Sequence, residues 1–416
     1  MTADVPPPAP IPPPSTHRSW KAFLAKHRTA AGFALVLAVC VALRGPERFR
    51  FAGDFRPRDN PQIAEAQAWW DGRMSLAERY WDTALVDGRV YTHFPPLFSI
   101  VSAIFVPFSE GVPRWAVFWL VVVPIPLLAY LLFLQCARSP LPAATMTIGL
   151  VCGTSLWPVM NRVLVAGSPW FVNQALATIG NLLFLLDYTG RRRIWLGAVG
   201  LVLAGLSRQL TVFYFPALIA LASRGGHGAN PGERGRISSA LIGLSAVLAV
   251  TGALNTLKFG RPWDSGYMHI YEGRDDPLCR DARTYGIFSF HYVPRNLYYA
   301  NVGAPQRVGR QNAWRPNPHG TGIWWTTPLL IWLLINFRRL WADRDARWLM
   351  LCSAAVFVAL MCYHSTGYAQ RGYNRYSLDY VPVWLALIGP GCFQGRRRWI
   401  SLAMILWSVW YFAWVI

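Results

Sequence analysis

Apolar residues along this chain come in long blocks that short clusters of charged residues separate. The blocks are near-continuous runs without amphipathic spacing, and they include Ile237–Leu257, Trp325–Asn336, Trp348–Tyr363, Val381–Pro390 and Ile400–Ile416. Inside a bilayer every backbone N–H and C=O group must find a partner within its own segment, so such runs must be helices. The pattern predicts an all-α, polytopic bundle of transmembrane helices.

Counting the blocks from a cytoplasmic N-terminus predicts about eleven crossings, if one short block bounded by prolines, Pro95–Pro107, is re-entrant and does not cross. The predicted organisation has four parts: a proline-rich cytoplasmic tail (1–28), a transmembrane module (29–257) with a first outer loop (44–92), a second outer loop (258–322) and C-terminal transmembrane helices (323–416). Both long loops are expected on the extracytoplasmic side.

Composition agrees with a membrane protein, because 54% of the residues are hydrophobic and only 14% are charged, against about 25% charged in soluble domains. The net charge is +20, but the basic residues close or open apolar runs, as at Arg191–Arg193 and Arg396–Arg398. This is the positive-inside pattern of cytoplasmic loops and not the continuous basic stripe of a nucleic-acid-binding protein. We therefore expect a multi-pass protein of the bacterial inner membrane and no nucleic-acid partner.

Carboxylates are concentrated in the two long loops, which hold thirteen of the 20 acidic residues. Exclusion of charge from lipid does not require this, since the short Arg-rich loops could also carry acids. In the first loop, Ile63–Trp70 and Met74–Trp81 are expected to form one or two short amphipathic helices. In the stretch Ile194–Ala222, Arg208 is expected at the turn between two short helices.

Metal chemistry has little support in the sequence. The seven cysteines show no metal-ligand spacing, and His269, His291, His319 and His364 share none either. No cofactor is predicted with certainty, no metal ligand is assigned, and a divalent metal remains open.

Five segments follow one another along the chain: Asp59-Asn60-Pro61 with Ala66 to Gly72, Asp87-Gly88-Arg89-Val90-Tyr91 with Pro95-Pro96-Leu97, Gly205-Leu206-Ser207-Arg208, Lys258-Phe259-Gly260 with Gly266-Tyr267, and Gly372 to Asp379. In this order they resemble the GT-C superfamily of membrane glycosyltransferases, the group of protein O-mannosyltransferases and aminoarabinose transferases. The resemblance covers nearly the whole chain. It implies an inverting transfer of sugar from a polyprenyl-phosphate lipid to a glycan, lipid or protein acceptor at the extracytoplasmic face.

Carried over by position, the resemblance makes Asp59 the general base on the acceptor hydroxyl, with Asp54 as the reserve. A cap at the start of a helix is the alternative for Asp59, since Asp before Asn-Pro is a common turn signal. Asp82 and Asp87 are expected to shape the loop. The remaining candidates divide by role: Arg208, Arg375 and Lys258 bind the donor phosphate, and His93, Tyr91, Tyr267 and Asp379 contact substrate.

Each cation also has a structural interpretation. Arg208 could extend to the membrane interface, Arg375 could form an internal ion pair, and Lys258 could end a helix by interaction with its dipole. Rival functions are a lipid-linked sugar flippase or other transporter, an O-antigen-ligase-like polytopic enzyme, and a non-catalytic scaffold. Transporters usually place ionisable residues within helices near the midplane and often show internal repeats, whereas this chain concentrates its carboxylates in two outer loops.

Overall fold

The computed structural model describes residues 17–44, 52–190, 192–223, 231–272, 274–308, 313–317, 319–367 and 373–416. Most of these residues are helical, which confirms the all-α class. The proline-rich segment before residue 17, and also Arg191 and Gly372 of the sequence patterns, lie outside the described residues.

The first half of the chain alternates long helices with the small elements of the first loop. These elements are α1 (His17–Arg44), β1 (Asp54–Phe55), α2 (Pro61–Trp70), β2 (Thr83–Val86), β3 (Arg89–Thr92), α3 (Leu97–Phe105), β4 (Val112–Pro113), α4 (Arg114–Val117), α5 (Pro124–Ala137), α6 (Pro140–Val151), α7 (Leu156–Ala166) and α8 (Pro169–Thr189). The 3₁₀ helix η4 separates two short helices before the next long one: α9 (Trp195–Gly205), η4 (Gln209–Tyr214), α10 (Phe215–Ala222) and α11 (Pro231–Phe259).

The second half begins with short elements and ends with further membrane-type helices. These are α12 (Tyr267–Tyr271), α13 (Pro277–Tyr285), α14 (Val293–Leu297), β5 (Gln306–Val308), β6 (Ala313–Arg315), α15 (Ile323–Thr326), α16 (Ile331–Ile335), α17 (Phe337–Ala342), α18 (Arg344–Met361), the 3₁₀ helix η8 (Arg375–Asp379), α19 (Val381–Ile388) and α20 (Arg397–Trp410). The strands form three two-stranded antiparallel pairs, β1 with β4, β2 with β3 and β5 with β6.

Within the described residues, four helices are long and apolar enough to cross a membrane: Arg114–Ala137, Pro169–Thr189, Gly235–Phe259 and Arg397–Val415. The pair α6 and α7, bent by 63° at its break, makes a fifth if it counts as one span. The structure therefore supports membrane spans but not the predicted eleven. Sequence counting exceeded this number because several apolar runs form short or interrupted helices, such as α9, α15 and α16.

The apolar stretch around Arg208 folds as two short helices, as predicted. Gly197 of α9 lies against Leu218 of α10, and Gly205 lies against Val212, so the two helices run antiparallel. Both pack on α11. Arg208 stands at the turn, directly before η4, where its backbone N–H still donates to Ala204. A charged residue in the middle of an apolar run thus marks the point where the chain reverses.

The first loop contains one of the two expected helices. Asn60 caps α2 by accepting a hydrogen bond from Gln62 N, and proline follows at the first helical position. The expected helix at Met74–Trp81 is wrong, because this segment is irregular and Leu76 bridges to Val90 of β3. Asp87 and Gly88 then both adopt positive φ and close the β2–β3 hairpin in the manner of a type I′ turn.

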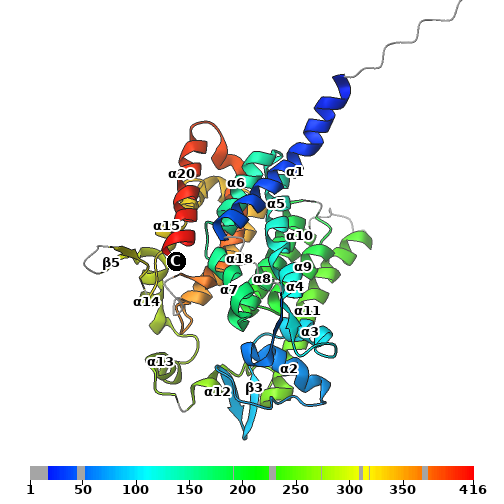
Figure 1. The fold of residues 1–416 in the computed structure, drawn as a ribbon, viewed down its shortest axis with the longest axis vertical. Coiled ribbons are helices and arrows are strands. Elements are labelled where there is room, and N and C mark those ends of the chain that lie inside the picture. The colour runs from blue at the N-terminus through cyan, green and yellow to red at the C-terminus, as the bar shows by residue number, and fades with distance from the viewer. Residues whose placement is uncertain are drawn as a thin grey trace, which may run out of the picture.

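The first loop and the first part of the second loop gather at one end of the molecule, while α14 and β5 of the second loop lie nearer to the C-terminal helices (Figure 1). Figure 1 shows α2, β3, α12 and α13 together below the long helices, while α1 projects from the bundle in the opposite direction. A small second hydrophobic cluster joins the loops, with Ala84 and Tyr91 of the first packed against Ile270, Tyr271 and neighbours of the second. The first loop and the α12–α13 part of the second loop therefore form one layer over one end of the helix bundle.

Candidate functional site

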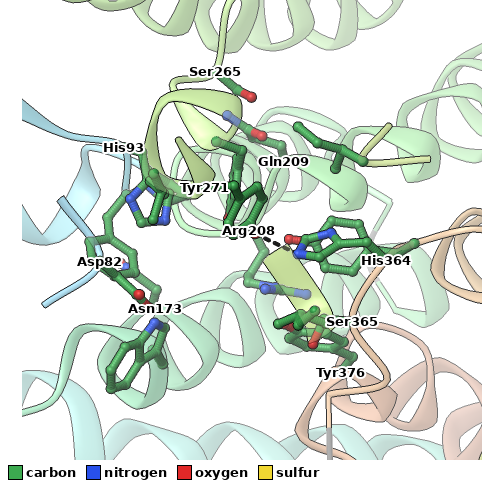
Figure 2. A pocket seen from close by; sticks show the side chains of 18 of the residues that line it. Asp82, His93, Asn173, Arg208, Gln209, Ser265, Tyr271, His364, Ser365 and Tyr376 are labelled. Atoms are coloured by element: carbon green, nitrogen blue, oxygen red, sulfur yellow. Dashed lines mark hydrogen bonds between the residues drawn. The ribbon is translucent and has the colours of Figure 1, made fainter. Parts of the chain in front are cut away.

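A cavity of about 430 Å³ lies where the loop layer meets the helices. Its walls come from the first loop, the start of α8, the turn at Arg208, the second loop, and the segment that follows α18. Figure 2 shows Asp82 and His93 on one side of the cavity and His364, Ser365 and Tyr376 on the other. A cavity with this volume falls within the usual range for small-ligand sites, roughly 300–1,000 Å³.

On the helical wall, Arg208 forms an ion pair with Asp379. The guanidinium Nη2 lies 2.7 Å from Asp379 Oδ2, and Nε lies 3.2 Å from the same oxygen. Asp379 is completely buried and receives a further hydrogen bond from Gln174 Nε2 at 2.8 Å, while Tyr214 donates to its backbone carbonyl. Because every contact comes from a packed helical element, this pair is held in one geometry.

Arg375 adds a second cation beside the first. It is buried, donates to the Tyr376 hydroxyl at 3.3 Å, and its guanidinium carbon lies 5.0 Å from the centre of that ring. Arg208 lies over the same ring at 4.6 Å. Burial raises the pKa of Tyr376, but the guanidinium groups of Arg375 and Arg208 outweigh it and lower the pKa from its usual value. Both guanidinium groups therefore lie against the same tyrosine ring at this side of the cavity.

On the loop wall, Arg274 joins the second loop to the first. Its Nη1 lies 3.0 Å from Asp82 Oδ1, and its guanidinium carbon lies 4.9 Å from the centre of the Trp81 ring. Asp82 adopts a positive φ directly before β2. All three residues line the cavity. Sequence reasoning missed Arg274, because it stands in a charged run, Glu272 to Asp276, that is typical of a solvated loop.

Two histidines line the cavity in neutral form. Burial lowers the pKa of His93 to about 3, with Lys258 and Arg274 adding to the effect, and burial lowers the pKa of His364 to about 4. His93 packs against the ring of Tyr267, with centroids 4.4 Å apart. His364 Nε2 lies 2.5 Å from the Tyr271 hydroxyl, the contact drawn as a dashed line in Figure 2. These imidazoles offer hydrogen bonds without charge.

The two carboxylates predicted for catalysis do not line this cavity. Asp59 is exposed, and its carboxylate accepts a hydrogen bond from Arg56 N at 2.9 Å, which caps the short 3₁₀ helix Pro57–Asp59, whereas α2 is capped by Asn60. Asp54 pairs with Pro113 in the β1–β4 ladder. The adjacent Asn60 donates a hydrogen bond to the Gly167 carbonyl just before α8, whose first turns line the cavity.

Lys258 also lies outside the main cavity. It is buried and forms an ion pair with Glu65 of α2, which in turn accepts a hydrogen bond from Ser99. Its ammonium group donates to the Thr92 carbonyl at 3.2 Å. Tyr91 packs edge-on against Phe259, with ring centroids 6.0 Å apart. These contacts connect the first loop to the end of α11 and support the cavity from behind.

The structure therefore brings together Arg208, Arg375, His93 and Tyr267 as cavity residues, with Asp379 behind Arg208, and leaves Asp59, Asp54, Lys258 and Tyr91 outside. The lining also contains residues that sequence reasoning did not select, among them Arg274, Trp170, Asn173 and Tyr363. The only sequence signal for Tyr363 is its position at the end of an apolar run, where polar residues begin.

In the part of the chain that the structure describes, no group of three or more His, Cys, Asp or Glu side chains is arranged to hold a metal ion. The chemical character of the cavity comes from arginines, aromatic rings, neutral imidazoles and the two carboxylates Asp82 and Asp276. No protein-family model and no curated protein sequence matches this chain.

Proposed function

We propose that this protein is a membrane glycosyltransferase of the GT-C type that uses a polyprenyl-phosphate-linked sugar. The observation that carries the proposal is the convergence of Arg208 and Arg375 on a cavity between an apolar helix bundle and a polar loop layer. A lipid-linked sugar has the same division, since its tail belongs in lipid and its headgroup in water. The cavity residues suit a phosphate next to a ring-shaped polar group.

The reaction in this proposal moves one sugar. The acceptor oxygen forms a bond to the anomeric carbon from the face opposite the phosphate, the carbon–oxygen bond to the phosphate breaks, and its electron pair stays on the polyprenyl phosphate. Arg208 and Arg375 stabilise the charge that the phosphate gains. The acceptor proton passes to a carboxylate acting as general base. The configuration at the anomeric carbon is inverted.

Two carboxylates of the first loop are candidates for the base. The resemblance to the GT-C superfamily gives this role to Asp59, whose neighbour Asn60 is hydrogen-bonded to the Gly167 carbonyl just before α8. The geometry brings Asp82 into the cavity itself. Because the two residues belong to different turns of the loop, single substitutions separate them.

The proposal extends to topology. A GT-C bundle with about eleven crossings would count the short helices α9 and α10 and the interrupted segment Ile323–Ile335 as further membrane-embedded elements. In this arrangement both long loops face the extracytoplasmic side of the bacterial inner membrane, and the cavity opens there.

The test uses purified protein in detergent with a radiolabelled polyprenyl-phosphate sugar and membrane extract as the source of acceptor. We expect the label to move from the lipid to the acceptor with the wild-type protein. If Asp59 is the general base, Asp59→Asn should lower the rate of sugar transfer by roughly 10²-fold or more. If Asp82 is the base, Asp82→Asn should have this effect instead. Movement of intact donor across liposomes without transfer would instead identify a flippase.

A further inference from the structure

We propose that Arg274 is a third ligand of the donor phosphate and that Asp82 is the carboxylate that the phosphate replaces on it. The inference rests on the proposed function, because it takes the phosphate of a polyprenyl lipid as the ligand of this cavity. It adds a phosphate-binding residue from the second loop and gives Asp82 a role as an exchangeable counter-ion.

The first support is the geometry of Arg274. A guanidinium has five N–H donors in a planar fork, and the ion pair with Asp82 is made through Nη1 at 3.0 Å. The Trp81 ring, with its centre 4.9 Å from the guanidinium carbon, supports the flat face of the group. Arginine held in this way can turn its edge to an anion while its face stays against the ring.

The second support is exposure. The side chains of Arg274 and Asp82 are 22% and 26% exposed, and both line the cavity. An anion that enters the cavity therefore reaches the pair directly, and the displaced carboxylate is already in contact with solvent. Such partly exposed pairs are worth little free energy, whereas an arginine–phosphate contact with two parallel hydrogen bonds is among the stronger polar interactions.

The neighbouring acid does not compete for this role. Asp276 also lines the cavity, but its carboxylate caps α13 by accepting a hydrogen bond from Cys279 N at 3.1 Å. Burial raises the pKa of Asp276, yet the hydrogen bonds from Cys279, with help from Arg274, lower it overall. Asp276 is therefore committed to its helix, and Asp82 is the exchangeable partner.

The inference predicts effects of opposite sign from the two members of one ion pair. Asp82→Asn removes the competitor for Arg274 and a negative charge from the cavity, so the affinity for the phosphate lipid rises. Arg274→Gln removes the ligand, so the affinity falls. A purely structural pair would behave differently, because loss of either member would then weaken binding in the same direction.

The experiment measures the dissociation constant of a short-chain polyprenyl phosphate without sugar, by titration of the full-length protein in detergent. We expect binding about three- to tenfold tighter with Asp82→Asn and roughly tenfold or more weaker with Arg274→Gln. The matched control is Arg73→Gln, which breaks an exposed first-loop ion pair with Asp71 at 2.6 Å outside the cavity and should change nothing.

Unchanged or weaker binding by folded Asp82→Asn protein, or unchanged binding by Arg274→Gln, would overturn the inference and leave the proposed function standing. If the wild-type protein transfers no sugar but the two variants show the expected changes in affinity, the phosphate site is confirmed and the proposed transferase function is refuted. A wild-type protein that binds inorganic phosphate as tightly as the lipid would assign the site to the free anion and overturn the inference.

Discussion

The cavity has two arginine–carboxylate pairs that differ in how they are held. On the helical wall, Asp379 is completely buried and is bound by both Arg208 and Gln174. On the loop wall, Asp82 and Arg274 belong to two loops and are both partly exposed. Burial makes a broken pair expensive, because the remaining charge has no water to solvate it. The first pair therefore maintains the fold, and the second is free to exchange partners.

The difference suggests a division of labour within one site. The helical wall supplies fixed positive charge at Arg208 and Arg375, positioned before any ligand binds, which is what stabilisation of a developing charge requires. The loop wall supplies a charge whose partner can change. Four tests follow, each of which separates the behaviour of the two walls or of the groups that support them.

The largest effect is expected from Arg208→Gln, which leaves the buried Asp379 carboxylate without its cation. The cost should be about 3–5 kcal/mol of stability, seen as a large fall in the thermal unfolding temperature in detergent. The double variant Arg208→Met with Asp379→Leu should regain most of the stability without regaining transfer. If Arg208→Gln melts like the wild type, the pair does not hold the helical wall.

Lys258→Met should destabilise the protein by a similar mechanism, by about 3 kcal/mol, because Glu65 is then left buried and unpaired. Lys258 was predicted to bind phosphate, but its position behind the cavity favours a supporting role. The double variant Lys258→Met with Glu65→Leu should therefore recover stability and bind polyprenyl phosphate with unchanged affinity. If the stable double variant binds polyprenyl phosphate tenfold more weakly, Lys258 is a phosphate ligand, as the sequence predicted.

The pH dependence of stability tests the buried histidine of the loop wall. Burial lowers the pKa of His93 from 6.5 to about 3, so the unfolded chain binds a proton in this range that the folded chain does not. Stability is thus full above pH 6.5 and falls as the pH is lowered toward 3, by roughly 1.4 kcal/mol per pH unit. Unfolding temperatures of His93→Gln should show a flatter decline. The exposed His291→Gln is the control, and an equal flattening there would refute the assignment.

The smallest effect is expected for the loop pair itself. A double-mutant cycle of Arg274→Gln and Asp82→Asn, measured by thermal unfolding, should give a coupling of at most about 1 kcal/mol, since both groups are partly exposed. A coupling of several kcal/mol would make this pair as structural as the one on the helical wall and remove the contrast between them.

Much of the fold could be predicted, because lipid and backbone chemistry impose it locally. Long apolar blocks require helices, and the charged Arg208 within such a block marks a reversal. Asp59-Asn60-Pro61 carries a helix-start signal, although the structure gives the cap of α2 to Asn60 and not to Asp59. The number of spans could not be obtained in this way. The length of an apolar block does not reveal where a helix is interrupted. The block Trp325–Asn336, for example, contains the break between α15 and α16.

The site was predictable only where a residue carried a local signal. Arg208 and Arg375 were selected because they lie in segments that resemble the GT-C superfamily, and both line the cavity. Partners could not be predicted, since Asp379 lies 171 positions from Arg208 and Arg274 lies 192 from Asp82. These pairs depend on how loops and helices pack together, and no short-range pattern encodes that packing.

The most direct test of the central claim is to find where a lipid phosphate binds. Purified protein would be irradiated with a polyprenyl phosphate that carries a photoreactive group next to the phosphate, and the labelled peptides identified by mass spectrometry. If the three arginines of the cavity bind the phosphate, label is expected in the segments around Arg208, Arg274 and Arg375. Label confined to the basic cluster at Arg396–Arg398, with none in the cavity segments, would contradict this assignment.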